Sequence, residues 1–202
     1  MTSSCSVVAL SGGVGGAKLA LGLARAVPGE ELLVVANPGD DFEHLGLTIC
    51  PDLDTLTYVL AGIDDQLRGW GRAGETWNYM EQLKGEGGET WFNLGDKDLE
   101  LHTERTRRLA AGESLSAITA DLTRRLGIAA RIVPATEDRL RTVVETESGD
   151  LAFQHYFVRE RCEPRVRGFR YDGAPAARPN PAVLEALASP ALQAVVICPS
   201  NP

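Results

Sequence analysis

The sequence lacks an excess of positive charge. It carries 20 Lys and Arg residues against 28 Asp and Glu residues, which gives a formal net charge of −8. Nucleic acids and anionic membranes bind to basic surfaces, because their phosphates must be neutralised. The composition therefore predicts no nucleic-acid and no membrane partner, although it is compatible with a local basic pocket for one small phosphorylated ligand.

Long apolar runs and paired cysteines are also missing. No apolar stretch reaches the length of a membrane span, and the first residues do not show a basic region followed by an apolar signal core. The four cysteines, Cys5, Cys50, Cys162 and Cys198, are scattered without a Cys-x-x-Cys pair. Zinc and redox motifs are therefore unsupported, and we expect a cytoplasmic protein with free, buried thiols.

A glycine-rich segment stands near the N-terminus. Residues 7–11 are mostly apolar, four glycines follow in five positions, and Leu19, Leu23 and Val27 then recur at helical spacing. This order predicts a strand, a tight loop and a helix whose first N–H groups and dipole favour an anion. The alternative is a glycine-rich turn that only packs the helix on the strand. The predicted phosphate-binding residues are Gly12, Gly13, Val14, Gly15, Gly16 and Lys18.

Two common phosphate-binding motifs do not fit this segment. A dinucleotide fingerprint needs a third glycine where Lys18 stands and an acidic residue after the second strand, which here ends at Asn37. A P-loop needs Ser or Thr after its lysine, where this chain has Leu19. A nicotinamide-dependent dehydrogenase is therefore disfavoured.

Four aspartates follow the next predicted strands, Asp40 and Asp41 in one loop and Asp52 and Asp54 after Pro51. Pro51 fits the first turn of a helix, where acidic residues can simply act as caps. However, crowded carboxylates repel one another unless a cation or a hydrogen-bond donor lies among them. Mg²⁺ prefers one or two carboxylates together with phosphate oxygens and water. The residues alone leave magnesium binding and helix capping equally open.

The rest of the chain shows several local patterns. Residues 75–83 and 102–128 have helical periodicity, and the charged residues 96–98 fit a solvated turn. Residues 142–146 and 151–158 alternate in polarity around a Ser-Gly-Asp turn, which predicts a β-hairpin.

Short motifs occur in a fixed order along the whole chain. They are Ser11-Gly-Gly-Val-Gly-Gly-Ala-Lys18, Asn37-Pro-Gly-Asp-Asp41, Cys50-Pro-Asp-Leu-Asp-Thr55, Gly69-Trp-Gly71, Glu75-Thr-Trp-Asn78, Leu94-Gly-Asp-Lys-Asp98, His102 and Pro199-Ser-Asn-Pro202. The ordered set resembles the 2-phospho-L-lactate transferase family, which acts in the biosynthesis of the deazaflavin coenzyme F-420. The resemblance implies an α/β fold: a Rossmann-like, mostly parallel sheet flanked by helices, with a β-hairpin insertion.

The resemblance covers roughly the first two-thirds of the family's length. We therefore expect one Rossmann-like transferase domain over residues 1–202, with a helical and hairpin insertion at about residues 70–175, that is truncated at its C-terminus. The implied reaction is the magnesium-dependent transfer of a phospholactyl or phosphoenolpyruvyl group from a guanosine-diphosphate-linked donor to the alcohol of Fo, a deazaflavin, with release of GMP. The alternative is a non-catalytic, sugar-nucleotide-binding regulator of the same superfamily. The sequence does not fix the oligomeric state, but a homodimer is plausible because dimers are the commonest oligomers.

The resemblance assigns the donor side of this reaction to short polar and acidic residues. The glycine loop, with Ser200 and Asn201, would hold the phosphates of the donor. Asp40 or Asp41, together with Asp52, would hold Mg²⁺. Catalysis of such a transfer consists mainly of positioning and charge neutralisation.

On the acceptor side, the resemblance assigns roles to a further acid and to aromatic residues. Asp54 would accept a hydrogen bond from the attacking hydroxyl as a candidate general base, so that Asp52 and Asp54 are the catalytic candidates. Trp70 and Trp77 would flank the deazaflavin. Asn93 stands at a position associated with Fo binding, where some members of the family carry Lys.

Overall fold

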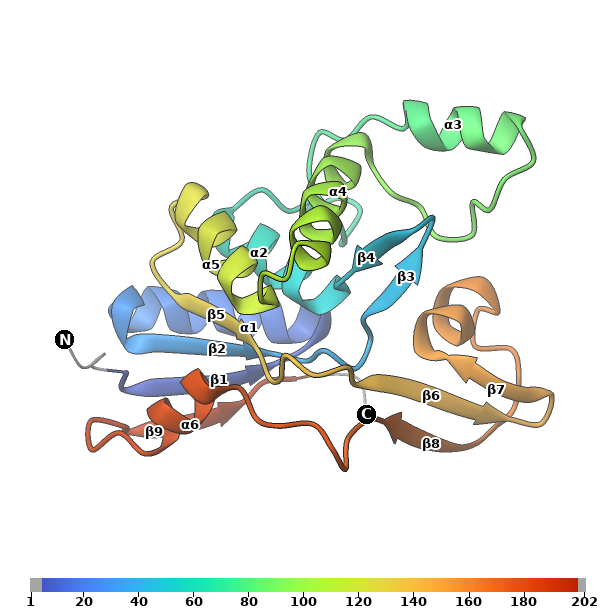
Figure 1. The fold of residues 1–202 in the computed structure, drawn as a ribbon. Helices are drawn as coiled ribbons and strands as arrows, with labels where there is room; N and C mark the ends of the chain where they lie inside the picture. The colour runs from blue at the N-terminus through green and yellow to red at the C-terminus, as the bar shows by residue number, and fades with distance from the viewer. Residues whose placement is uncertain (1–4, 200–202) are drawn as a thin grey trace.

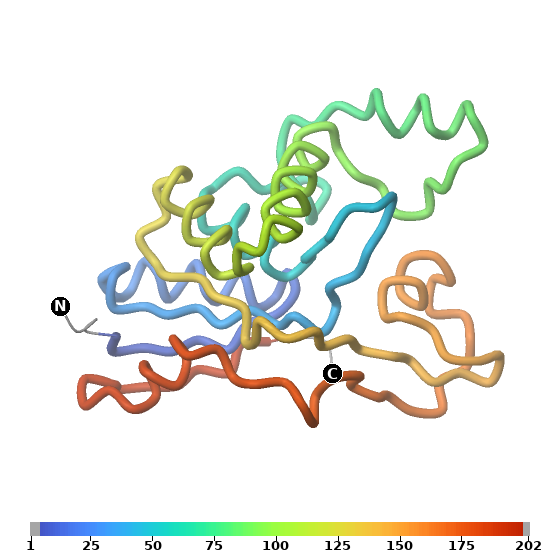
Figure 2. The backbone as a smooth tube through the Cα atoms, in the orientation of Figure 1, coloured from blue at the N-terminus to red at the C-terminus, as the bar shows by residue number. Residues whose placement is uncertain are grey.

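The computed structural model describes residues 5–199, which form both strands and helices (Figure 1; Figure 2 shows the backbone alone). No helix in this part of the chain is long and apolar enough to cross a membrane. The strands are β1 (Val7–Ser11), β2 (Leu32–Ala36), β3 (Phe42–His44), β4 (Leu47–Ile49), β5 (Arg131–Pro134), β6 (Arg141–Thr146), β7 (Gly149–Ala152), β8 (Val166–Asp172) and β9 (Ala194–Ile197). The helices are α1 (Gly13–Ala26), α2 (Pro51–Ala61), α3 (Asn78–Gly85), α4 (Asp96–Ala110), α5 (Leu115–Arg125) and α6 (Pro181–Leu187), with the short helices η1 (Gly29–Glu31) and η2 (His155–Arg159).

Four parallel strands form the central sheet in the order β5-β2-β1-β9. The chain passes from β1 through α1 to β2 on one side of β1, whereas β9 pairs with the other side of β1. The carboxyl end of β1 is therefore a topological switch point, the place where open α/β sheets bind ligands. This arrangement confirms the α/β fold with a mostly parallel sheet.

Helices cover both faces of this sheet because its strands alternate apolar side chains between the faces (Figure 1). On one face, Ala9 and Val34 pack with Leu53 and Leu56 of α2 and with α1. On the other face, Val8, Leu33 and Val35 pack against α6. The sheet is thus the middle layer of three, and it holds the loops at its carboxyl edge in place.

Two insertions extend the central unit. Helices α3 and α4 and the β3–β4 hairpin lie on one side of it, and the antiparallel sheet β7-β6-β8 forms a separate module (Figure 1). Strand β5 falls within the range 70–175, where a single insertion is expected, yet it pairs with β2 in the central sheet. The helical and hairpin parts are therefore separated in the chain by a strand of the core.

The expected hairpin is confirmed for β6 and β7, but the expectation of a strand over residues 151–158 is wrong. Strand β7 ends at Ala152, and η2 follows at His155–Arg159. The helical turn places the rings of Phe153 and Phe157 in a stack, 5.6 Å between centroids and 11° between planes. Side chains four residues apart meet in this way on a helix and not on a strand.

Candidate active site

A cavity of about 770 Å³ opens beside the carboxyl end of β1. Residues from distant parts of the sequence line it, including the loop after β1, the first turns of α2 and residues around η2. Two of its surfaces differ in chemistry. The glycine wall consists of Gly12, Gly13, Val14 and Gly15, and the aromatic wall consists of Trp70, Trp91, Phe92, Phe153 and Phe157.

The glycine wall is the start of α1. Gly13 has a φ of +60°, in the left-handed region that favours glycine. The preceding residue, Gly12, offers no side-chain cap, and the first turn of α1 contains no acidic residue. The N–H groups of this turn lack intrahelical partners and carry the positive end of the helix dipole. The wall can therefore receive an anion such as a phosphate.

Gly16 and Lys18, two further predicted phosphate-binding residues, do not line the cavity. Gly16 is buried, and a Cβ at this position would lie 2.5 Å from Ser11 Oγ and 3.2 Å from the Pro199 carbonyl oxygen. Lys18 is exposed and does not line the cavity. Ser200 and Asn201 lie outside the described residues. Pro199, which directly precedes them, does line the cavity.

Asp40 and Asp52 bring two carboxyl groups to the cavity. Oδ1 of Asp52 accepts the N–H of Gly13 at 2.7 Å, and its Oδ2 accepts Nδ2 of Asn37 at 2.9 Å. Burial and, to a smaller extent, the charge of Asp52 raise the pKa of Asp40 to about 7, although the side chains of Thr142 and Asn37 lower it in part. Burial also raises the pKa of Asp52. Such a repelling pair favours a cation nearby.

The pair Asp40 and Asp52 fits a magnesium ion whose remaining coordination positions are filled by oxygens of a bound ligand. Within residues 5–199, no three His, Cys, Asp or Glu side chains gather into a preformed metal site. Mg²⁺ does not need such a group, because one or two carboxylates with phosphate oxygens suffice. Asp41, the other metal candidate, is buried outside the cavity lining, and its Oδ1 has no hydrogen-bond partner among the described residues. Burial raises the pKa of Asp41 to about 7.

Asp54 lines the cavity next to this pair but is held in a buried ion pair. Both of its oxygens accept N–H groups of the Arg105 guanidinium, and His102 Nδ1 lies 3.7 Å from Oδ2. Burial lowers the pKa of His102 to about 4, which leaves its ring neutral at pH 7 although Asp54 acts in the opposite direction. The arrangement fixes the carboxylate of Asp54 at the cavity surface.

A further acid, Asp98, lies near Asp54. Its Oδ1 accepts the hydroxyl of Tyr58 at 2.6 Å, and both residues line the cavity. The pKa of Asp98 is raised to about 6, mainly by burial and also by the charge of Asp54, although the hydrogen bond from Tyr58 lowers it in part. Asp54 and Tyr58 lie one turn apart on α2, so this helix supplies both groups.

The aromatic wall offers flat apolar surface for a ring system. Trp70 is 45% exposed and lines the cavity together with Asn93. Trp77 does not line it. It contacts Trp70 edge-on at 6.4 Å between centroids, and the Arg68 guanidinium lies 4.9 Å from the Trp70 ring and 4.8 Å from the Trp77 ring. Trp77 thus supports Trp70 from behind the wall.

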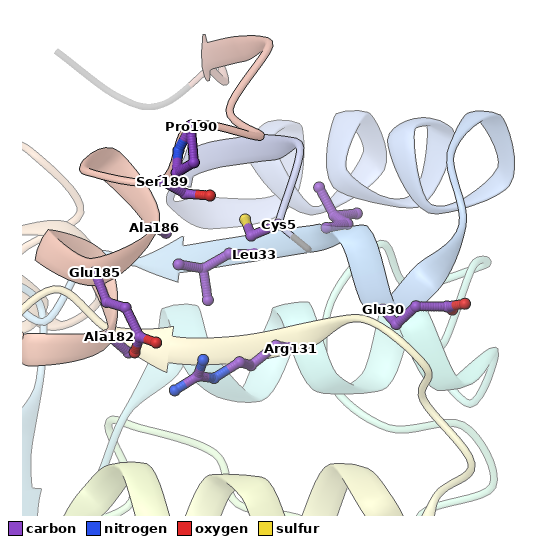
Figure 3. A pocket seen from close by; sticks show the side chains of 10 residues that line it. Cys5, Glu30, Leu33, Arg131, Ala182, Glu185, Ala186, Ser189 and Pro190 are labelled. Carbon is purple, nitrogen blue, oxygen red and sulfur yellow. The ribbon is translucent and has the colours of Figure 1, made fainter. Parts of the chain in front are cut away.

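A smaller pocket of about 130 Å³ lies at the amino ends of the strands, between the sheet and the end of α6 (Figure 3). Cys5, Leu33 and Arg131 line it from the sheet, and Glu185 and Ser189 line it from the side of α6 (Figure 3). It is remote from the glycine wall and from the group of acids. The larger cavity is therefore the candidate site.

The comparison with protein families identifies the chain. A model of the family described as 2-phospho-L-lactate transferase CofD matches residues 7–202. The chain belongs to the 2-phospho-L-lactate transferase family. This finding confirms the resemblance carried by the ordered motifs, and it makes the chain a member of a family of enzymes that transfer a phosphate-containing group.

Curated relatives support the same assignment. The chain is 42% identical over 201 residues to a phosphoenolpyruvate transferase from Streptomyces griseus and 43% identical over 204 residues to one from Nocardia farcinica. Each match covers 97% of this chain but only 63% and 61% of the respective relative. The chain therefore spans less than two-thirds of the length of these relatives.

Solved structures support the fold alone. Two crystal structures of a Bacillus halodurans protein, one of them described as a member of the UPF0052 family, match with TM-scores of 0.56 and 0.55 at 15% identity. Each match covers 90% of this chain and 55% of that protein.

In this member of the 2-phospho-L-lactate transferase family, the motifs at residues 75–78 and 94–98 are joined by reciprocal hydrogen bonds, which we call the clasp. Glu75 accepts the N–H groups of Lys97 and Asp98 at the start of α4, and Asp96 accepts those of Asn78 and Tyr79 at the start of α3. The expectation of a solvated turn at residues 96–98 is therefore wrong, because α4 begins there. The clasp places Asp98 at the cavity.

Sequence reasoning missed Arg105, Tyr58 and Asp98 as members of the site. A usable signal was present on α4, since its buried residues Asp98, His102 and Arg105 recur at intervals of four and three. A buried polar stripe on a helix indicates a partner of matching polarity, and the acids of α2 supply it here.

Proposed function

We propose that this chain carries the site of an enzyme that transfers a phosphoenolpyruvyl or phospholactyl group from a guanosine-diphosphate-linked donor to the alcohol of Fo, with release of GMP. The observation that carries the proposal is one cavity in which the N-terminus of α1 and two carboxyl groups stand together with a wall of aromatic side chains. A phosphate-rich donor and a flat-ring acceptor require these two kinds of surface.

For the donor, we assign the diphosphate to the glycine wall. The N–H groups of the first turn of α1 after Gly13, whose own N–H is bound to Asp52, would bind its oxygens. Asp40 and Asp52 would hold Mg²⁺, which supplies positive charge against the phosphate oxygens when it is bound. The bond from Gly13 to Asp52 ties the glycine wall to this carboxylate, so that both contacts form in one place.

For the acceptor, we assign the reacting hydroxyl to Asp54. Each oxygen of a carboxylate has two lone pairs, so Asp54 can accept a further hydrogen bond while Arg105 holds it. Arg105 contacts both oxygens of Asp54 and so fixes the direction of the carboxylate. Its main contribution would therefore be the orientation of the attacking hydroxyl. The aromatic wall would hold the deazaflavin ring.

The relatives favour one of the two donors. The compared proteins from Streptomyces griseus and Nocardia farcinica are both named phosphoenolpyruvate transferase. By similarity to them, we propose that the enolpyruvyl-linked donor is the preferred substrate of this chain.

The test uses the chain as it stands. Titration with Fo should change the fluorescence of the deazaflavin, and addition of the enolpyruvyl-linked donor with Mg²⁺ should release GMP, measured by chromatography. Asp54→Asn should slow the release about 10²–10⁴-fold without changing the affinity for GDP. The control is Glu104→Gln, an exposed carboxylate on α4 that pairs with Arg107. Binding of GDP without any binding of Fo or release of GMP would instead support a nucleotide-binding regulator.

A further inference from the structure

Asp98 is a buried carboxyl group that the proposed transfer does not use. It is 7% exposed, and one of its oxygens, Oδ1, is occupied by the hydroxyl of Tyr58. The other oxygen, Oδ2, receives no hydrogen bond from the described residues, and none of their cationic side chains forms an ion pair with Asp98. Asp98 lines the cavity together with Gly71, and a Cβ at Gly71 would lie 4.0 Å from Oδ2.

A structural role alone does not explain a carboxyl group at this position. Burial disfavours its charge, and the charges of Asp54 and Glu75 oppose it as well, so that its pKa is raised although the Tyr58 hydrogen bond and the charge of Arg72 favour the charged form. An asparagine would accept the hydroxyl of Tyr58 equally well and would bring no charge. The feature that only a carboxylate supplies is a second oxygen that acts purely as an acceptor.

The surroundings of Oδ2 suit a ligand. Gly71 has a φ of +73°, and its lack of a side chain leaves the space in front of Oδ2 open. Trp70 of the aromatic wall directly precedes Gly71 in the sequence. Tyr58 holds Oδ1 from α2, so the direction of the free oxygen is set before a ligand arrives.

The geometry points to Asp98 as a binding residue for the acceptor: its Oδ2 accepts a hydrogen bond from an N–H or O–H group of the flat heteroaromatic alcohol that lies on the aromatic wall. This inference rests on the proposed function and extends it to specificity. An acceptor-only oxygen selects ligands that present a donor at this point and disfavours those that present a carbonyl.

The experiment compares Asp98→Asn with the unaltered chain. The substitution keeps the bond from Tyr58 and replaces the free oxygen by an NH₂ group, which cannot accept a hydrogen bond. We expect the Kd for Fo, measured by its fluorescence, to rise about tenfold or more, with the Kd for GDP and the kcat at saturating Fo nearly unchanged. Glu104→Gln makes the same chemical change on the exposed side of α4 and should leave both constants as they are.

A second variant is used if thermal melting shows that Asp98→Asn does not fold. Tyr58→Phe keeps the carboxylate but removes the bond that orients it, and it should raise the Kd for Fo several-fold while the Kd for GDP stays constant. An unchanged Kd for Fo in the folded variants, or an equal loss of Fo and GDP binding, overturns the assignment. If the unaltered chain itself fails to bind Fo, the proposed function fails first, so the two failures are distinguishable.

Discussion

At the residue scale, Gly16 and Gly22 share helix α1 but differ in the space around them. A Cβ at Gly16 would lie 2.5 Å from Ser11 Oγ, whereas nothing lies within 4 Å of a Cβ at Gly22. We expect Gly16→Ala to lower the free energy of unfolding by about 1–3 kcal/mol through overpacking. Gly22→Ala should raise it by about 0.5–1 kcal/mol, because alanine favours helix. Urea unfolding of both variants measures the difference, and equal effects would contradict the close packing of Gly16.

Single residues were predictable where their role is local. The glycines after β1 follow from the strand–loop–helix pattern, since the loop and its helix are adjacent in the chain. The partner of Asp54 was not predictable, because Arg105 is 51 residues away and only the packing of α4 against the start of α2 brings them together. Asp41 shows the same limit: its neighbour Asp40 reaches the cavity and Asp41 does not.

At the scale of elements, the clasp between the starts of α3 and α4 sets the position of the cavity wall. Asp96 accepts N–H groups from Asn78 and Tyr79 as well as the hydroxyl of Thr76. These bonds lower the pKa of Asp96 to about 2, the bond from Thr76 most of all. Gly95 is needed beside them, because a Cβ there would lie 2.2 Å from the Glu75 carboxyl carbon.

We expect Asp96→Ala to open the start of α3. Without the carboxylate, the N–H groups of Asn78 and Tyr79 lose their acceptor, and their hydrogen exchange should become faster. Exchange read by mass spectrometry over residues 76–82 measures this. Glu81→Ala, which removes another acid from the first turn of α3, is the matched control and should leave exchange at Asn78 and Tyr79 unchanged. Equal protection in both variants would show that the clasp does not hold α3.

Elements were predictable from the sequence where their signals lie within them. Pro51 and the acids after it predict the start of α2, and the structure has Pro51 in the first turn of that helix. The start of α4 was missed because the acceptor for its first N–H groups is Glu75, 22 and 23 residues earlier in the chain. The end of β7 was missed because the ring stack of Phe153 and Phe157 overrides the alternating pattern.

At the scale of the whole molecule, several acidic residues lie in or next to one cavity, among them Asp40, Asp41 and Asp54. Asp54 is paired with Arg105, whereas Asp40 and Asp41 form no ion pair within residues 5–199. Their pKa values of about 7 lie above the ordinary 3.8. Between about pH 4 and pH 7 the folded protein therefore holds protons that the unfolded chain has lost, and stability falls as the pH rises. His102, with a pKa of about 4 instead of 6.5, acts in the opposite direction, but only below pH 6.5.

Asp40→Asn should therefore flatten the fall in stability between about pH 4 and pH 7, by at most about 1.4 kcal/mol per pH unit for one group. The amide cannot ionise, so the charge that repels Asp52 never forms. Because the amide also removes one of the two carboxylates proposed to hold Mg²⁺, Mg²⁺ at about pH 8 should raise the thermal midpoint of the unaltered chain more than that of the variant. Urea unfolding across this range, and melting with and without Mg²⁺, measure the two effects. Parallel pH profiles together with equal responses to Mg²⁺ would show that neither charge repulsion nor cation binding centres on Asp40.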